Sequence, residues 1–186
     1  MKRIFDIVFA VILLVLLFCP SILIAIAIKM TSNGKIIYWS DRIGKNNDIF
    51  KMPKFRTMKT DTPEVATHLL LNSNDALTSI GKFLRRYSFD EVPQLWSILI
   101  GKMSFVGPRP ALFNQHDLIE LRSSFGIDKL LPGLTGWAQI NGRDKLKIKD
   151  KVDKDLEYLN RRSFLFDLKI IWLTIVRISS KDGVSH

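Results

Sequence analysis

The chain has few of the residues that build disulfides and metal centres. Its 186 residues include one cysteine, Cys19, and three scattered histidines. A single cysteine excludes an internal disulfide, and so few sulfur and imidazole ligands give no zinc-binding spacing. A reducing, cytoplasmic setting is therefore the default expectation. Acidic side chains are also scarce, at 18 against 28 basic ones, which gives a formal net charge of +10.

The excess of positive charge predicts a polyanionic partner. Nucleic acid, anionic lipid headgroups and a phosphorylated substrate are all compatible with it. The sequence contains no recognisable nucleic-acid recognition module, no internal repeat and no low-complexity tract. Because 25% of the residues are charged, a polytopic membrane protein is excluded, and the length fits a single domain.

One long stretch, residues 7–28, lacks charged side chains altogether. At about 1.5 Å per residue it could span a bilayer. A cleaved signal peptide fits poorly, because the apolar part exceeds the usual length of roughly 7–15 residues. A single-pass anchor also has a difficulty, because basic residues on both flanks favour the cytoplasmic side.

Pro20 offers a third interpretation of this stretch. Proline lacks an N–H group, and its ring bends a helix. The Cys19 thiol and the Ser21 hydroxyl could satisfy the backbone groups that the bend frees. A helix broken here could enter the membrane and return to the same face. From the residues alone, a simple span and a re-entrant helix remain equally open.

Residues 35–58 are predicted to form two extended segments around a turn at residues 44–48. Pro53 restricts the second segment to a sheet edge. In an extended strand Lys54 and Arg56 point to the same side, where the two cations repel each other unless an anion lies between them. A solvated basic edge that discourages aggregation is the alternative interpretation.

From Ile80 onward the apolar period becomes helical. Two stripes are predicted. Ile80, Phe83, Leu84 and Tyr87 form a helical stripe, and Val92, Leu95, Trp96 and Leu99 form a buried one. Ser88 and Glu91 have the spacing of a capping box, and Asp90 would favour the positive end of the second helix. Gly101 is a natural stop. Capping alone could therefore explain the two adjacent carboxylates.

Two later loops carry groups suited to nucleotide recognition. In Gly107–Pro110 two prolines stiffen the backbone around Arg109, which suits bidentate phosphate recognition. Residues 131–143 combine turn residues with an aromatic ring, amides and an arginine. This loop could stack on and hydrogen-bond a nucleobase through Trp137, Gln139, Asn141 and Arg143. A glycine-rich connection with a core tryptophan is the alternative.

Two helices are predicted at the C-terminal end. Residues 150–162 form a charged helix with Asp150–Lys154 and Glu157–Arg161 spaced as ion pairs. Residues 164–178 are apolar but interrupted by charges, which fits an interfacial helix with Trp172 at headgroup depth or an ordinary buried helix. The expected fold is thus mainly α with a small β-hairpin (α+β). It divides into a membrane helix at residues 1–30, broken at Pro20, and a cytoplasmic domain at residues 31–186.

Four motifs together resemble the bacterial sugar transferase family, the monotopic phosphoglycosyl transferases, in its minimal catalytic-core form. The motifs occur in family order and are Lys54–Met58, Ser88–Leu95, Gly107–Pro110 and Pro132–Gln139. The resemblance implies that sugar-1-phosphate passes from a UDP-sugar to polyprenyl (undecaprenyl) phosphate, releasing UMP. It also implies a requirement for Mg²⁺. This would be the first membrane step in the assembly of a capsule, O-antigen, exopolysaccharide or glycoprotein glycan.

The resemblance also implies roles for individual residues. Asp90 would be the nucleophile that forms a covalent phosphosugar intermediate and a ligand of Mg²⁺, with Glu91 as its catalytic partner. The basic residues Lys54, Arg56, Arg86 and Arg109 would neutralise phosphates. A diphosphate repels an attacking carboxylate, so surrounding cations are what this chemistry needs.

A membrane position follows from the same resemblance. It implies a re-entrant helix turned at Pro20, with Cys19 at a position where relatives often have serine, on the cytoplasmic face of the bacterial inner membrane. Residues 62–70 resemble a segment of relatives that handle N-acetylated amino or deoxyamino sugars. A membrane-surface adaptor without catalysis and a membrane-tethered nucleic-acid binder are the rival hypotheses, and the oligomeric state stays open.

Overall fold

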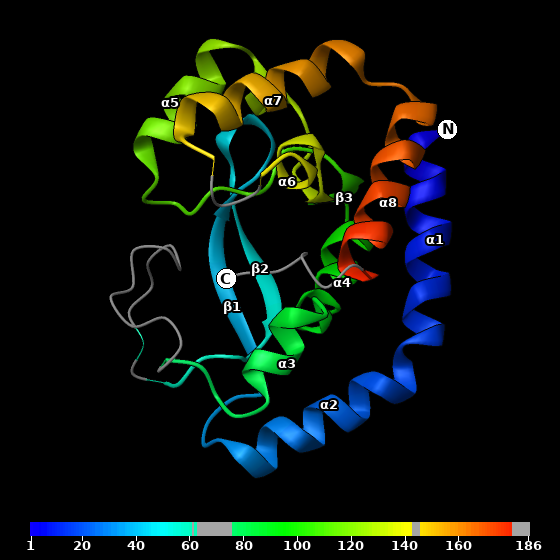
Figure 1. Ribbon diagram of the computed structural model, residues 1–186, viewed down its shortest axis with the longest axis vertical. Coiled ribbons are helices and arrows are strands. Elements are labelled where there is room, and N and C mark those ends of the chain that lie inside the picture. The colour runs from blue at the N-terminus through cyan, green and yellow to red at the C-terminus, as the bar shows by residue number, and fades with distance from the viewer. Residues whose placement is uncertain (61, 63–75, 143–145, 180–186) are drawn as a thin grey trace.

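A computed structural model describes residues 1–60, 62, 76–142 and 146–179 (Figure 1). The helices are α1 (Lys2–Leu16), α2 (Phe18–Thr31), α3 (Gly81–Arg86), α4 (Gln94–Leu99), α5 (His116–Ser124), α6 (Trp137–Ile140), α7 (Ile148–Arg161) and α8 (Phe164–Ser179). The strands are β1 (Ile37–Ile43), β2 (Ile49–Phe55), β3 (Ser104–Val106) and β4 (Gly133–Thr135). The predicted α+β class is confirmed. The short parallel pair β3–β4 was not foreseen.

The predicted hairpin is present as β1 and β2, which pair antiparallel from Ile37↔Phe55 to Ile43↔Ile49. Its turn places Asn46 and Asn47 at φ of 56° and 63°, a left-handed conformation that asparagine tolerates better than most residues. Pro53 lies in a two-stranded sheet, so both strands are edges and its missing N–H is tolerated. The hairpin runs along the middle of the molecule between α3 and α5 (Figure 1).

The main core joins both ends of the chain to the hairpin. It combines Ala10 of α1, Phe50 and Met52 of β2, Ile98 of α4 and Ile170 of α8, all nearly fully buried. Burial alternates along β2 from Ile49 to Met52, as the pleat of a strand with one face on the core requires, and Pro53 and Phe55 are buried as well. The start of α8 also meets the start of α1, where the rings of Phe5 and Phe164 lie 5.3 Å apart.

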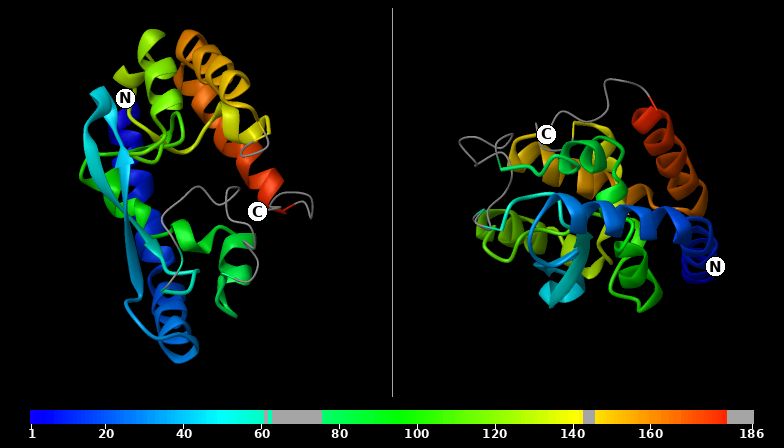
Figure 2. Two further views of the ribbon diagram at one scale, coloured as in Figure 1. Left: turned by 90° about the vertical axis from the view of Figure 1, so that its left-hand side faces the viewer. Right: turned by 90° about the horizontal axis from the view of Figure 1, so that it is seen from below.

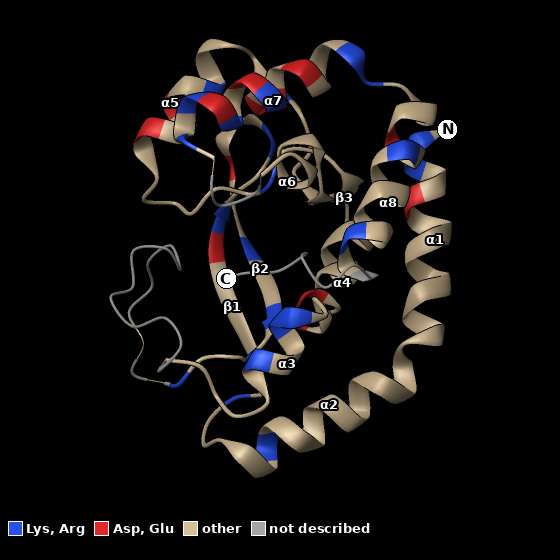
Figure 3. Ribbon diagram, viewed as in Figure 1, with Lys and Arg blue, Asp and Glu red and all other residues tan. Residues whose placement is uncertain are grey.

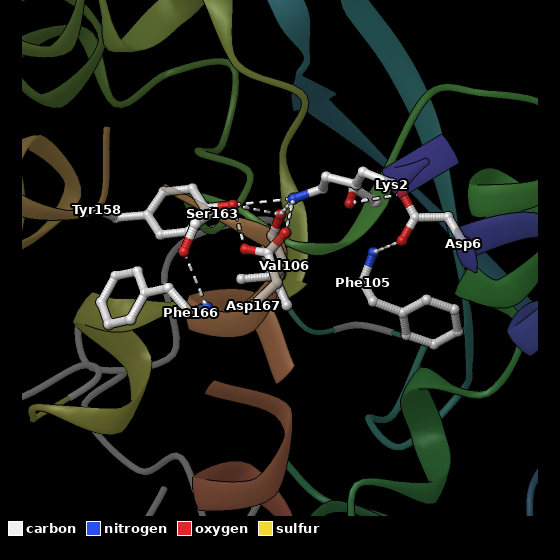
Figure 4. A network of polar contacts seen from close by, with 9 residues as sticks. Lys2, Asp6, Phe105, Val106, Tyr158, Ser163, Phe166 and Asp167 are labelled. Atoms are coloured by element: carbon white, nitrogen blue, oxygen red, sulfur yellow. Dashed lines mark hydrogen bonds and ion pairs between the residues drawn. The ribbon is translucent and has the colours of Figure 1, made fainter. Parts of the chain in front are cut away.

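A polar network fixes the first turn of α1 (Figure 4). The Lys2 ammonium donates to the Val106 carbonyl at 2.9 Å, to the Tyr158 hydroxyl at 2.9 Å and to the Asp167 carboxylate at 2.7 Å. The Asp6 carboxylate accepts hydrogen bonds from the Ser104 hydroxyl and the Phe105 amide. These polar groups thus have partners, as buried ones must.

The N-terminal apolar helix bends at Leu17, in the turn that precedes Pro20, the residue predicted to cause the break. The helices α1 and α2 meet there at a bend of 60°. A proline ring excludes the carbonyl four residues earlier, so the break falls in the preceding turn and Pro20 itself fits the first turn of α2. The Ser21 amide donates to the Leu17 carbonyl at 2.9 Å, and Cys19 is exposed.

Within the described residues, α1 and α2 together have the length and apolarity of a membrane segment, whereas no single helix does. Figure 3 shows that charge is confined to the ends of this pair. Both helices have a face that packs on the protein, where Ala10 of α1 and Ile28 of α2 are fully buried, but many other apolar side chains are exposed, among them Val15 at 72%, Leu23 at 68% and Met30 at 81%. A helix that is apolar on all sides is typical of burial in protein or lipid.

The predicted stripes of α3 and α4 are only partly buried. Leu84 and Leu95 lie in the core, but Phe83, Tyr87 and Trp96 are 52%, 43% and 55% exposed. The expectation that Trp96 is buried is therefore wrong. Both helices are only six residues long, and a helix of less than two turns has few positions that face the core. Gly101 ends the second segment with φ of +83°, as expected.

The C-terminal helices α7 and α8 match the predicted segments closely. Lys154 pairs with Glu157 at 3.1 Å, and Arg161 pairs with the same carboxylate. Helix α8 buries Phe166 and Ile170 but leaves Leu165 and Trp172 exposed at 77% and 65%. One face of α8 is therefore buried, and the position of its apolar outer face at a membrane interface stays a prediction. Figure 2 shows α3 and the C-terminal part of α8 on the same side of the hairpin.

Candidate active site

The two adjacent carboxylates do not cap a helix. Ser88 takes a left-handed conformation, with φ of 56° and ψ of 22°, and its hydroxyl makes no capping bond. A 3₁₀ turn, Phe89–Glu91, follows it, and α4 begins only after Pro93. The predicted capping box is therefore wrong, because the turn and the helix are separate elements. Asp90 and Glu91 are instead buried, with exposed fractions of 7% and 9%.

Two cations from other segments hold Glu91. Its Oε1 atom accepts hydrogen bonds from Lys54 Nζ at 3.2 Å and from Arg109 Nη2 at 3.1 Å. Lys54 lies near the end of β2, and Arg109 lies in the proline-flanked loop after β3. Three distant segments thus meet at one carboxylate, and the turn that carries it contacts α3.

Asp90 shares this electrostatic environment. Burial raises the pKa of Asp90, and the nearby Glu91 raises it further, while the charges of Lys54, Arg85 and Arg109 act in the opposite direction. Burial also lowers the pKa of Lys54, despite the attraction of Glu91 and Asp90. Both shifts mean that the site disfavours its own charges on balance. A buried carboxyl whose pKa is raised beside several cations is a candidate for a functional site.

The basic pair on α3 is divided between two environments. Arg85 points inward, where its Nε donates to the Thr57 hydroxyl at 3.0 Å and its charge acts on Asp90. Arg86, which we expected at the phosphate site, is exposed and lies over the Tyr87 ring at 5.8 Å. A helical projection could have separated them, because Arg86 lies about 200° around the helix from the buried Leu84.

Arg56 is buried but points elsewhere. Its Nη2 atom donates to the carbonyl and hydroxyl of Ser32, at 3.2 and 2.8 Å. Strand β2 ends at Phe55, so the expectation that Lys54 and Arg56 share one side does not extend to Arg56. In this structure Arg56 ties the end of the hairpin to the end of α2 and does not join the carboxylate pair.

The residues expected at a nucleobase make local contacts here. The Trp137 ring packs against Phe166 at 5.1 Å, and the Arg161 guanidinium lies 5.7 Å from the Trp137 ring. Gln139 Nε2 donates to the Leu134 carbonyl, and Asn141 Nδ2 donates to the Trp137 carbonyl. Arg143 lies outside the described residues. These contacts match the alternative interpretation, a packed connection, while leaving the nucleotide role untested.

A magnesium ion fits this site only as one shared with a substrate. Within the described part of the chain, no group of three or more His, Cys, Asp or Glu side chains could hold a metal ion. Asp90 and Glu91 supply two carboxylates, and one or two carboxylates together with substrate phosphates are what Mg²⁺ commonly uses. The donor set is therefore compatible with the predicted ion.

The carboxylate pair and the cations around it define a class of site. A buried carboxylate pair surrounded by Lys54, Arg85 and Arg109 suits a substrate rich in negative charge and an attack by a carboxylate oxygen. The chain also matches a family model described as "Bacterial sugar transferase" over residues 1–181. The protein belongs to the bacterial sugar transferase family, as its motifs predicted.

The relatives differ in how much of their length the chain covers. It is 40% identical to the UDP-glucose:undecaprenyl-phosphate glucose-1-phosphate transferase of Escherichia coli, over 95% of this chain and 40% of the relative. The "Uncharacterized sugar transferase EpsL" of Bacillus subtilis is 35% identical, over 100% of this chain and 91% of its own length. Exopolysaccharide production protein ExoY of Sinorhizobium fredii is 34% identical, over 98% and 87%.

Proposed function

We propose that the protein transfers a sugar-1-phosphate from a UDP-sugar to undecaprenyl or another polyprenyl phosphate. The observation that carries this proposal is the buried Asp90–Glu91 pair, with Lys54 and Arg109 on Glu91 and Arg85 beside Asp90. The names of the relatives support the reaction, because those of Escherichia coli and Komagataeibacter xylinus are transferases acting on undecaprenyl phosphate. The name of ExoY supports a place in polysaccharide synthesis.

In the proposed mechanism an Asp90 carboxylate oxygen attacks the β-phosphorus of the UDP-sugar. The bond between that phosphorus and the bridging oxygen breaks, and UMP leaves with the bridging oxygen. A phosphate oxygen of the polyprenyl acceptor then attacks the same phosphorus and releases Asp90. The covalent step divides one transfer between two large substrates into two displacements.

The surrounding cations have defined parts in this mechanism. Lys54 and Arg109, which contact Glu91 in this structure, would bind the diphosphate and offset its repulsion of Asp90. Arg85 would hold Asp90 in its ionised, nucleophilic form. Mg²⁺ bound by Asp90, with Glu91 as a second carboxylate, would supply charge neutralisation at the phosphates.

The proposed location is the cytoplasmic face of the bacterial inner membrane. The bent pair α1–α2 would enter the bilayer and return, and the outer face of α8 would lie at the interface. Reagents outside intact cells should then fail to label a cysteine introduced near position 35 in a Cys19→Ser background. Labelling there would contradict a re-entrant pair and support a simple span.

Two observations bear on the identity of the donor sugar, and they favour different sugars. The names of several relatives specify glucose, whereas the resemblance at residues 62–70 favours an N-acetylated amino or deoxyamino sugar, and residues 63–70 lie outside the described part of the chain. A panel of UDP-sugars, assayed with undecaprenyl phosphate and Mg²⁺, would decide between them by UMP release.

The same assay tests the nucleophile. Asp90→Asn should abolish UMP release, and mass spectrometry should find no sugar phosphate on the variant. The parent protein, incubated with the donor alone, should carry one on the peptide that contains Asp90. Asp41→Asn is a matched control, because Asp41 is a partly buried carboxylate at the surface that pairs with Lys51. Near-normal turnover by Asp90→Asn would refute the assignment.

A further inference from the structure

The loop that carries Arg109 is held by hydrogen bonds along its backbone. Its backbone groups form hydrogen bonds with residues of five other elements, in most cases as acceptors and once as a donor. These bonds are Lys2 Nζ and Tyr158 Oη to the Val106 carbonyl, Gly107 N–H to the Thr135 carbonyl, Gly133 N–H to the Pro108 carbonyl, Arg122 Nη1 to the Arg109 carbonyl and Arg42 Nη1 to the Pro110 carbonyl. Only one of these bonds, the one from Arg122, is made to the backbone of Arg109 itself.

That bond comes from a buried ion pair. Arg122 of α5, 8% exposed, donates Nη1 to the Arg109 carbonyl at 2.8 Å. Its Nε and Nη2 both donate to Oδ2 of Asp155, at 3.0 and 2.6 Å. Asp155 belongs to α7 and is 1% exposed. Helices α5 and α7 therefore fix the Arg122 guanidinium, and the guanidinium fixes the peptide group that follows Arg109.

The two prolines of the loop leave this peptide group to be fixed by something else. They set φ at residues 108 and 110, but the orientation of the Arg109 carbonyl depends on ψ of Arg109, which a following proline restricts only to a broad extended range. The bond from Arg122 removes that remaining freedom. The direction in which the Arg109 side chain leaves the backbone, toward Glu91 at 3.1 Å, depends on it.

We propose that Arg122, held by Asp155, is a positioning residue for Arg109. A buried ion pair adds little net stability compared with apolar residues of similar size, so its contribution here is orientation. The Arg122 guanidinium lies behind the loop and binds the main chain of Arg109. It thus acts on the substrate-binding cation without touching the substrate.

The first test uses a paired substitution that leaves no unpaired buried charge. Arg122→Met together with Asp155→Leu removes the bond to Arg109 while keeping the volume filled. Hydrogen exchange at the amides of Gly107, Gly133 and Ile43, whose bonds to Thr135, Pro108 and Ala111 tie down the loop, should become at least about 10-fold faster, since a lost hydrogen bond from a charged donor is worth about that factor or more. Val152→Ala, a buried site on the same helix α7, is the control and should leave these amides protected. Unchanged exchange in the paired variant would overturn the proposal.

The second test is a double-mutant cycle, and it alone rests on the proposed function. The paired substitution should lower kcat/KM for the UDP-sugar by roughly 10- to 100-fold when Arg109 is present, because small misplacements of a binding group cost about that much. In an Arg109→Ala background it should cost less than about twofold. The same loss in both backgrounds would mean a merely structural role. If the parent released no UMP, the proposed function would fall, and the exchange experiment would still decide this inference.

Discussion

Two polar clusters join distant parts of this chain, and they differ in how well their charges are satisfied. Around Lys2, the Asp167 carboxylate receives the ammonium at 2.7 Å and the Tyr158 hydroxyl at 2.8 Å, and the pKa of Tyr158 is raised by burial and by Asp167 (Figure 4). Around Asp90, burial raises the carboxyl pKa and lowers that of Lys54. The first cluster stabilises the fold, whereas the second retains charges that the fold disfavours.

This difference is consistent with the proposed role of the charges around Asp90 in binding and chemistry. Charges that cost stability are typical of sites that await a charged ligand, because the ligand supplies the missing interactions. The cluster around Lys2 needs no ligand, because its donors and acceptors already meet one another. Matched substitutions in the two clusters should therefore have opposite effects on stability.

The largest contrast should come from Asp90→Asn and Asp167→Asn. Asp90→Asn should reduce UMP release by at least about 10³-fold, as loss of a nucleophile does, while raising the apparent Tm at pH 7. Asp167→Asn should lower Tm by several degrees, because the Lys2 ammonium and the Tyr158 hydroxyl lose a charged acceptor worth about 1.5–3 kcal/mol. Thermal unfolding in detergent and the UMP assay measure both. A fall in Tm for Asp90→Asn would break the comparison.

The stability gain of Asp90→Asn should depend on pH. Below the unfolded pKa of aspartate, about 3.9, the carboxyl is neutral in both states, and the variant and the parent should have similar Tm values. As the pH rises through the raised pKa of the folded state, the parent must ionise a buried group and loses stability, which the variant does not. The Tm difference should therefore grow from acid toward neutral pH. A constant difference would assign the gain to something other than ionisation.

A smaller contrast is expected within strand β2. Lys54→Met should lower kcat/KM for the UDP-sugar by roughly 10- to 100-fold, because it removes a buried cation from the diphosphate site. Lys51→Met is the matched control, since Lys51 is 66% exposed and pairs with Asp41 on the surface. It should change kcat/KM less than about twofold. Comparable losses from both lysines would show that net charge alone, and not this arrangement, determines donor binding.

The elements of this fold were largely predictable from sequence, because periodicity and turn chemistry are local. The hairpin, with its turn at residues 44–48, and the helices α7 and α8 lie where the pattern placed them. The bend lies at Leu17, one turn before Pro20, because a proline deprives the carbonyl four residues earlier of its partner. The left-handed Ser88 had no local signal, since serine follows capping chemistry in most sequences.

The site was predictable in its motifs but not in its contacts. Adjacent carboxylates, Lys54 and the proline-flanked Arg109 could be identified as candidates, but which cations reach Glu91 depends on tertiary packing. The alternation rule failed for Arg56 because the strand ends one residue before it. Arg122 had no sequence signal, because its partners, Arg109 and Asp155, lie in other segments.

The smallest contrast compares the two neighbouring arginines of α3. Arg85 faces Thr57 and Asp90, whereas Arg86 is exposed and lies over Tyr87. Arg85→Gln should lower UMP release by roughly 10-fold. It should also shift the acid limb of the pH–rate profile to higher pH, because the Arg85 cation lowers the pKa of Asp90. Arg86→Gln should change turnover by less than about threefold and leave the profile in place. If Arg86→Gln had the larger effect, Arg85 would not be the arginine that acts on Asp90. The expectation that Arg86 neutralises the phosphates would then stand.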